Sequence, residues 1–343
     1  MNDRSCLAGI VTLLVACISM QRADAADPAL IAAAKKEGSV TWYTTLIVNQ
    51  MARPAVDAFE RKYGVKVNYI RNDSADIMQR VLTEARAGQV QADIYDGVSG
   101  LGVFKRANLL QSWLPDMASI MPKDYYDPAG YWIGVSLYIH SYAYNTDIVQ
   151  AADAPASLDD LLNPKWRGQL ALGASPSTTG VVGFVGHVLT KLGEQKGIEY
   201  LRKLALQRPA ILSVSARQVM DMVIAGEYKV GVQMLTHHAA FSSMRGAPVE
   251  WVPTDDAMGA LLILGLFKGP HSSAGKLLID FLMSDEGQAI FRDADYIPAS
   301  PNVAARQARL KPDGVTFKAR FFTPDELDAK QPEWMKVYQD TLK

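Results

Sequence analysis

Two adjacent histidines are the first residues in this chain that could do chemistry. His237 and His238 stand in VGVQMLTHHAAF, at the end of a short apolar run. Neutral imidazole suits zinc, copper or nickel, and it can also form a hydrogen bond to a polar or anionic ligand. Neighbouring side chains point about 100° apart on a helix and to opposite faces of a strand, so both rings reach one ion only in a loop or at a helix start. Metal ligation by His237 and His238, a hydrogen bond from His237 to a ligand, and plain packing are the three alternatives.

Polar residues also follow several predicted strands. Arginine holds a carboxylate or a phosphate through two parallel charge-assisted bonds, which makes Arg71 and Arg217 candidate anchors. The segment SPSTTG, residues 175–180, precedes an apolar helix and combines hydroxyls with free backbone N–H groups, which suits an anion. Each candidate has a structural alternative, because hydroxyls also cap helices and arginines also pair with surface acids. The candidate ligand-binding residues are Thr44, Thr45, Arg71, Asn72, Ser99, Ser177, Thr178, Thr179, Ser215, Arg217 and His237.

The energy of binding requires several of these loops to act together. A helix terminus contributes about 0.3–1 kcal/mol to holding an anion, whereas micromolar affinity corresponds to about 8 kcal/mol. We therefore expect the loops to converge on one gap.

The elements that would position these loops alternate between strand and helix. Apolar spacing predicts strands at 39–45, 65–70 and 92–98, with helices at 49–64 and 74–88 between them. This order implies right-handed crossovers and a parallel sheet, in which ligands bind beyond the carboxyl ends of the strands. A second α/β unit begins near residue 142, and 272–291 reads as two adjoining amphipathic helices.

The composition favours a small solute as the partner. Half of the 343 residues are apolar and the net charge is −1, with no run of basic residues interleaved with aromatic ones, so we expect no nucleic-acid partner. No H-E-x-x-H spacing and no nucleophile elbow occur in the sequence, which speaks against an enzyme.

The first 25 residues have the pattern of a signal peptide. A short charged start precedes an apolar stretch, and small residues lead up to a cleavage point after Ala25. Both cysteines, Cys6 and Cys17, would then be removed, so we expect no disulfide. The alternative is a lipoprotein anchored through Cys17, because LVAC resembles a lipoprotein cleavage site.

Several segments together resemble a known family. These are SLDDLLNPKWRGQLAL, VIAGEYKVGV, SSAGKLLIDFLMSDEGQAIF and YIPASPNV. Their order and spacing resemble the bacterial extracellular solute-binding proteins of the ferric-iron type, the receptors of ABC importers. The similarity runs from residue 39 to about 302.

The resemblance implies a periplasmic-binding-protein-like α/β fold, in which two lobes joined by hinge strands enclose the ligand cleft. The expected layout assigns 26–140 and 250–298 to the first lobe, 141–249 to the second, and 299–343 to a C-terminal helical tail that packs on both. The crossings are expected near 131–145 and 248–260. The resemblance also implies a monomer in the periplasm, an ABC permease in the inner membrane as partner, and no cofactor.

The histidine pair departs from that family. Its ferric-binding members carry two adjacent tyrosines in the segment that aligns with THHAAF, and those phenolates ligate iron. Phenolate is a hard anionic donor that suits ferric iron, whereas imidazole does not. Arg71, Arg217 and the hydroxyl-rich helix starts favour a small anionic solute, an organic carboxylate or phosphoryl compound. A ferric-iron receptor with a companion anion is the alternative, and a secreted hydrolase is a further one.

Overall fold

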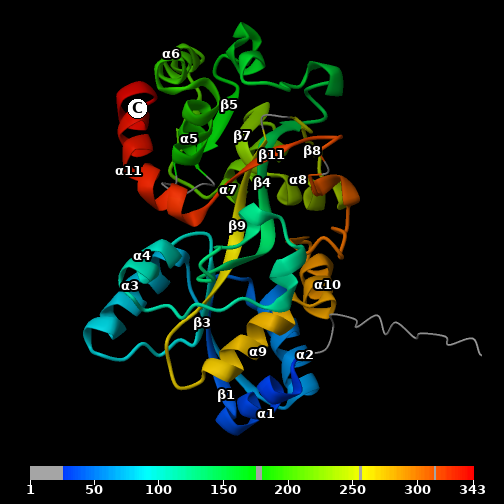
Figure 1. Cartoon of the computed structure of the whole chain (residues 1–343). Helices are drawn as coiled ribbons and strands as arrows, with labels where there is room; N and C mark the ends of the chain where they lie inside the picture. The colour runs from blue at the N-terminus through cyan, green and yellow to red at the C-terminus, as the bar shows by residue number, and fades with distance from the viewer. Residues whose placement is uncertain (1–25, 175–179, 255–256, 313) are drawn as a thin grey trace, which may run out of the picture.

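The structure is a computed structural model that describes residues 26–174, 180–254, 257–312 and 314–343. Its strands form one sheet, and along its main path the order is β2-β1-β3-β9-β4-β7-β5-β6 (Figure 1). The long strands β4 (Ile133–Asn145) and β9 (Ala257–Leu266) lie in the middle of this order. The sheet therefore has two halves that share its central strands.

The N-terminal half alternates between strand and helix as the sequence predicts. Its elements are α1 (Pro28–Glu37), β1 (Ser39–Thr44), α2 (Arg53–Tyr63), β2 (Lys66–Arg71), α3 (Ser74–Arg86), β3 (Ile94–Gly97) and α4 (Leu101–Arg106). Strand β1 pairs in parallel with both β2 and β3. The chain enters α2 through a π-helical turn, η1 (Val48–Ala52), where the sequence predicts an uninterrupted helix. Gly64 ends α2 with a left-handed φ of 69°, which glycine adopts without strain.

The second half has its own parallel strands. Its elements are β5 (Leu170–Gly173), α5 (Val181–Leu192), α6 (Glu194–Ala205), β6 (Ala210–Leu212), α7 (Ala216–Ile224), β7 (Val230–Leu235), α8 (Thr236–Met244) and β8 (Val249–Trp251). Strand β5 pairs in parallel with β6 and β7. Helix α8 begins directly after β7, so the end of this strand leads straight into a helix N-terminus.

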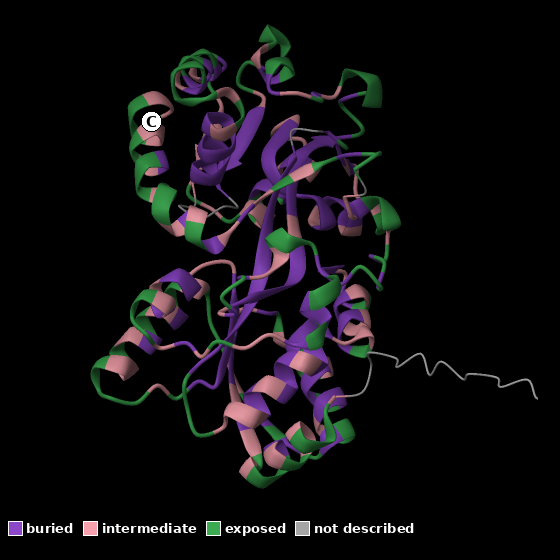
Figure 2. Ribbon diagram, viewed as in Figure 1, coloured by how far each residue is buried: buried purple, intermediate pink, exposed green. Residues whose placement is uncertain are grey.

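Strands β4 and β9 pair with each other in antiparallel orientation and connect the halves. The end of β9 pairs with β3 of the first half, whereas the end of β4 pairs with β7 and β8 of the second. Both strands are buried along nearly their whole length, as Figure 2 shows by their purple colour. The predicted crossings overlap these strands, although the exact lobe boundaries stay a prediction.

The C-terminal part returns to both halves. It comprises α9 (Ser272–Met283), α10 (Asp285–Asp293), β10 (Ile297–Pro298), β11 (Ala319–Phe322) and α11 (Pro324–Thr341). Helices α9 and α10 form the predicted adjoining pair, and the Ser284 hydroxyl between them caps α10 by accepting a hydrogen bond from Gly287 N–H. The tail is not wholly helical as expected, because β11 joins the sheet beside β9. Helix α11 contacts α5 and α6 in the second half and α4 in the first.

Short turns of 3-10 helix complete the described chain. They are η2 (Asp116–Ile120), η3 (Lys123–Tyr125), η4 (Ala151–Asp153), η5 (Asp159–Leu162), η6 (Pro164–Trp166) and η7 (Ala308–Leu310). None of the described helices is both long enough and apolar enough to cross a membrane.

Candidate ligand-binding site

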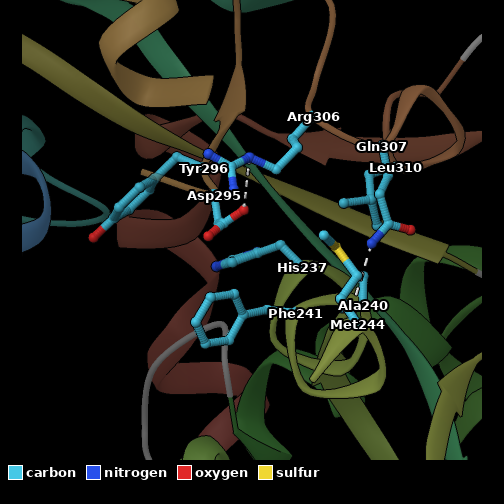
Figure 3. A pocket seen from close by; sticks show the side chains of 9 residues that line it. All are labelled: His237, Ala240, Phe241, Met244, Asp295, Tyr296, Arg306, Gln307 and Leu310. Atoms are coloured by element: carbon cyan, nitrogen blue, oxygen red, sulfur yellow. Dashed lines mark hydrogen bonds and ion pairs between the residues drawn. The ribbon is translucent and has the colours of Figure 1, made fainter. Parts of the chain in front are cut away.

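A pocket lies between α8 and the segment that follows α10 (Figure 3). Helix α8 contributes one wall and residues around 295 and 306–310 contribute the other. The lining residues are His237, Ala240, Phe241, Met244, Asp295, Tyr296, Arg306, Gln307 and Leu310. Most are aromatic or apolar, two carry full charges, and the cavity between them is small.

The start of α8 carries buried polar groups without partners, and of its residues His237 lines this pocket. No side chain caps the helix, so its first backbone N–H groups have no side-chain partner. The Thr236 hydroxyl and the Nδ1 atom of His237 are also buried without a hydrogen-bond partner among the described residues. Unpartnered buried polar groups are costly unless something binds them. A ligand at this helix start would supply the missing partners.

Three rings gather around His237. The Tyr138 ring from β4 lies with its centroid 5.7 Å from that of His237, and the Tyr296 ring lies 6.1 Å away. His238 lies edge-on to His237, with 4.6 Å between the centroids. The backbone of Ile47, just after β1, acts to lower the pKa of Tyr296, which therefore lies near the first half.

The histidines here are neutral at physiological pH. Burial lowers the pKa of His237 well below its ordinary value, and the nearby His238 and His140 lower it further. Burial lowers the pKa of His238 to about 4, and the positive charge of Arg217 acts in the same direction. A neutral imidazole offers one donor and one acceptor, so His237 can hydrogen-bond a ligand without carrying a charge.

Asp295 and Arg306 provide the charges of the pocket. The Asp295 Oδ1 atom lies 3.2 Å from Arg306 Nε. Asp295 follows α10 in a left-handed conformation, with a φ of 63°, and Arg306 also donates to the backbone oxygen of Asp293 over 2.8 Å. Gln307 donates to the backbone oxygen of Ala240 over 3.4 Å, which ties this segment to α8.

The predicted residues at the end of β1 are engaged within the protein. Thr45 donates to Asp96 through both its backbone N–H and its hydroxyl, over 3.0 and 2.8 Å. The Thr44 hydroxyl accepts a hydrogen bond from Leu46 N–H. Burial raises the pKa of Asp96 to about 6, against the opposing effect of its hydrogen bonds. Thr44 and Thr45 thus shape the loop, and their contact with a ligand stays a prediction.

The candidates after β2 and β3 do not line the pocket. Arg71 is exposed and lies 3.3 Å from Asp73, and its positive charge acts on the pKa of Tyr296. Asn72 is exposed, and its N–H donates to the backbone oxygen of Thr44. Ser99 is half-buried, and its backbone oxygen accepts a hydrogen bond from the Tyr95 hydroxyl.

The candidates in the second half have local partners. Ser215 caps α7 together with Gln218, the structural alternative that the sequence left open. Arg217 donates to the Ser242 hydroxyl and pairs with Asp221, 2.6 Å away, while its charge acts on His238. Ser177, Thr178 and Thr179 lie outside the described residues.

Among the predicted residues that the structure describes, His237 alone lines this pocket. Tyr296 and Arg306, its partners across the pocket, are missing from the sequence prediction. Tyr296 is the first residue of YIPASPNV, a segment that supports the family resemblance but contains no predicted ligand-binding residue. Arg306 follows no predicted strand, although it lines the pocket. In the described parts of the chain, no group of three or more His, Cys, Asp or Glu residues could hold a metal ion.

A family model described as "Bacterial extracellular solute-binding protein" matches residues 89–320, about two thirds of the chain. The chain belongs to this family. The matched region includes β4, β9 and every residue that lines the pocket.

Among its relatives, this solute-binding protein is 25% identical over 314 residues to a Salmonella typhimurium protein provisionally named as a 2-aminoethylphosphonate-binding periplasmic protein. That match covers 88% of this chain and 85% of the relative. An Fe(3+)-binding periplasmic protein of Serratia marcescens is 24% identical over 270 residues, covering 75% of this chain and 78% of the relative.

Solved structures confirm the expected periplasmic-binding-protein-like fold. Iron-bound HitA from Pseudomonas aeruginosa has a TM-score of 0.74 at 19% identity, covering 88% of this chain and 99% of that one. AfuA from Actinobacillus pleuropneumoniae, with fructose-6-phosphate bound, has a TM-score of 0.70 at 22% identity, covering 89% and 99%.

Proposed function

We propose that this solute-binding protein captures a small anionic solute, a phosphoryl compound or an organic carboxylate, and delivers it to an ABC permease. The observation that carries the proposal is that one pocket holds both His237, at the uncapped start of α8, and Arg306. Together these groups offer charge-assisted and backbone-type donors to one anion.

The proposal requires several donors to act together on one anion. The helix start comes from one segment, and the guanidinium of Arg306 and the amide of Gln307 come from a second one. Aromatic walls keep water away, which strengthens hydrogen bonds inside the pocket. Arg71 and Arg217 lie outside the lining, but their charges act on Tyr296 and His238 and add to the positive potential around the site.

The relatives support a phosphoryl group more than iron. One is named for a phosphonate, and a similar fold holds a sugar phosphate. Iron-binding proteins also share the fold, but the histidine pair stands where the family resemblance implies iron-binding tyrosines, and neutral imidazole is a poor ligand for ferric iron. Ferric iron with a companion anion is therefore not favoured. We propose no hydrolase activity, because the family is one of binding proteins.

Binding would act through closure of the two halves about β4 and β9. A ligand that contacts both halves stabilises the closed state by its difference in affinity for the two states. Tyr296, near Ile47 of the first half, lines the same pocket as α8 of the second half, which supports this proposal.

We further propose that the mature protein is a periplasmic monomer released after Ala25, which presents its closed form to a permease in the inner membrane. Anchoring through Cys17 is the alternative. The mass of the mature protein distinguishes them, because a lipidated product would begin at residue 17.

A thermal-shift panel tests the function. Phosphonates, phosphate esters, small carboxylates and ferric citrate are added to the purified protein. A true ligand at about 100 times its Kd adds about 2.7 kcal/mol of stability. We expect an anion to stabilise the wild type but not Arg306→Gln, whereas Arg202→Gln, an exposed change on α6, keeps the effect. Stabilisation by ferric iron and by none of the metal-free anions would overturn the proposal.

A further inference from the structure

Residues 300–311, here called the strap, cross from the first half of the protein to the second. The strap follows β10 and lies beside α10, a helix that contacts α2 of the first half. On its other side it contacts α8 and β8 of the second half. Figure 1 draws it in orange between α10 and α8. A change in the strap therefore acts on how the two halves lie relative to each other.

Both ends of the strap are anchored beside α10 and β4. Ser300 is fully buried, and its N–H donates to the side-chain oxygen of Gln288 in α10 over 2.9 Å. The Gln288 amide in turn donates to the backbone oxygen of Val135 in β4 over 3.0 Å. The ammonium of Lys311 donates to the backbone oxygens of Ser300 and Val303, so the end of the strap returns to its beginning. The strap is thus a closed loop on a fixed base.

Arg309 holds the strap to the second half. Its Nη2 atom donates to both side-chain oxygens of Glu250 in β8, over 3.0 and 2.9 Å, and its guanidinium lies 5.6 Å from the centre of the Trp251 ring. The N–H of Trp251 also donates to Glu250, over 2.9 Å, which fixes the carboxylate on β8. The Nε atom of Arg309 donates to Gln307, whose amide donates to the backbone oxygen of Ala240 in α8 (Figure 3). One arginine thus connects the strap to both β8 and α8.

The contact between Arg309 and Glu250 matters more for the arrangement of the halves than for folding. The two side chains are 41% and 26% exposed, and an exposed ion pair contributes little to the free energy of unfolding. The open and closed states of a two-lobed protein, however, differ little in free energy. A contact that forms in one state and breaks in the other therefore shifts their populations even when it is weak.

We propose that the strap sets the orientation of the two halves and that the contact of Arg309 with Glu250 fastens it to the second half. With the contact formed, α8 and β8 are held against the loop that is anchored at α10. With the contact broken, β8 moves away from the strap and the halves take up a wider range of orientations. This inference extends the proposed closure of the halves and does not depend on which solute binds.

Electron-spin distance measurements on the ligand-free protein test the proposal. Cys6→Ser and Cys17→Ser remove both cysteines of the full chain, and Arg86→Cys in α3 and Lys203→Cys in α6 then place one spin label at an exposed position on each half. We expect one main distance in this protein. Glu250→Gln should increase the population at other distances about three- to fivefold, as the loss of a weak ion pair does. An unchanged distance distribution would overturn the proposal and, because no ligand is present, would leave anion binding untouched.

Further variants assign the effect to this contact. Arg309→Met removes the other partner and keeps an apolar side chain, and combining it with Glu250→Gln should change the populations no more than either single change does. Additive effects would show that the two residues act separately, which would overturn the fastening. Glu286→Gln is the matched control, because it breaks an exposed ion pair of 2.7 Å with Lys62 that joins α10 to α2 within the first half. An equal shift of the distances in this control would also overturn the proposal, and the melting temperature of each variant shows that it folds.

Discussion

Gly102 in α4 and Asp328 in α11 approach so closely that a β carbon at position 102 would overlap the Asp328 carboxylate. Ion pairs flank this contact, with 3.5 Å between Lys105 Nζ and Asp325 Oδ2 and 3.8 Å between Arg106 and Asp328. Helix α11 also packs on α5 through Trp334, which lies against Gly186. It therefore joins the two halves at a second place besides β4 and β9.

We expect Gly102→Ala to loosen this contact and to weaken ligand binding by about three- to tenfold, because closure brings the halves together here. Calorimetric titration with the ligand found in the panel measures the change. Gly269→Ala is the matched control, since a β carbon there would meet its nearest neighbour at an ordinary 3.5 Å. Unchanged affinity in Gly102→Ala would show that α11 plays no part in closure.

His237 should contribute directly to affinity. His237→Ala removes the ring that lines the pocket, and we expect the ligand to bind about tenfold more weakly through the loss of a hydrogen bond. His271→Ala is the comparison, because that ring lies before α9 and within 3.3 Å of Asp93 instead. If both variants bind like the wild type, His237 only packs.

The buried histidines predict a loss of stability in acid. Burial lowers the pKa of His140 to about 3, below its value in the unfolded chain, so the unfolded state binds the proton first. The contribution of neutral His140 to the free energy of unfolding is complete above pH about 6.5. It is lost as the pH falls towards 3, by up to about 1.4 kcal/mol per pH unit. Asp96, whose pKa is raised to about 6, acts in the opposite direction between pH about 4 and 6.

Comparing the stability of the wild type with that of His140→Gln isolates the effect of His140. Urea unfolding of the wild type and of His140→Gln is followed from pH 7 to pH 4. We expect the stability advantage of the wild type to shrink as the pH falls, because the glutamine side chain does not titrate. An advantage that stays constant over this range would mean that His140 titrates normally.

Asp96 should hold the loop after β1 in place. It accepts hydrogen bonds from Trp42 Nε1 over 2.7 Å and from Thr45. Asp96→Ala leaves these donors without their acceptor, and we expect a loss of about 2–4 kcal/mol in the free energy of unfolding. Denaturant unfolding measures it. Asp147→Ala serves as an exposed control, and equal losses in the two variants would contradict this role.

Local patterns were sufficient to predict the alternating elements and to single out His237, which lines the pocket. Helix periodicity and Gly64 predict α2 within one or two residues of its end, and the apolar run before Thr236 predicts β7. Arg306 and Tyr296 were not predictable in this way, because their place beside His237 depends on how the chain returns to α8 after α10. The pairing of Thr45 with Asp96 spans 51 residues, so no local pattern reports that its hydroxyl is already engaged.

Native mass spectrometry of the protein, purified without denaturation, is the most direct test of anion capture. We expect a bound organic solute that carries a phosphoryl or carboxylate group in the wild type, and its absence from Arg306→Gln. A bound mass that corresponds to ferric iron, or an anionic solute that remains equally bound in Arg306→Gln, would contradict capture of the solute in this pocket.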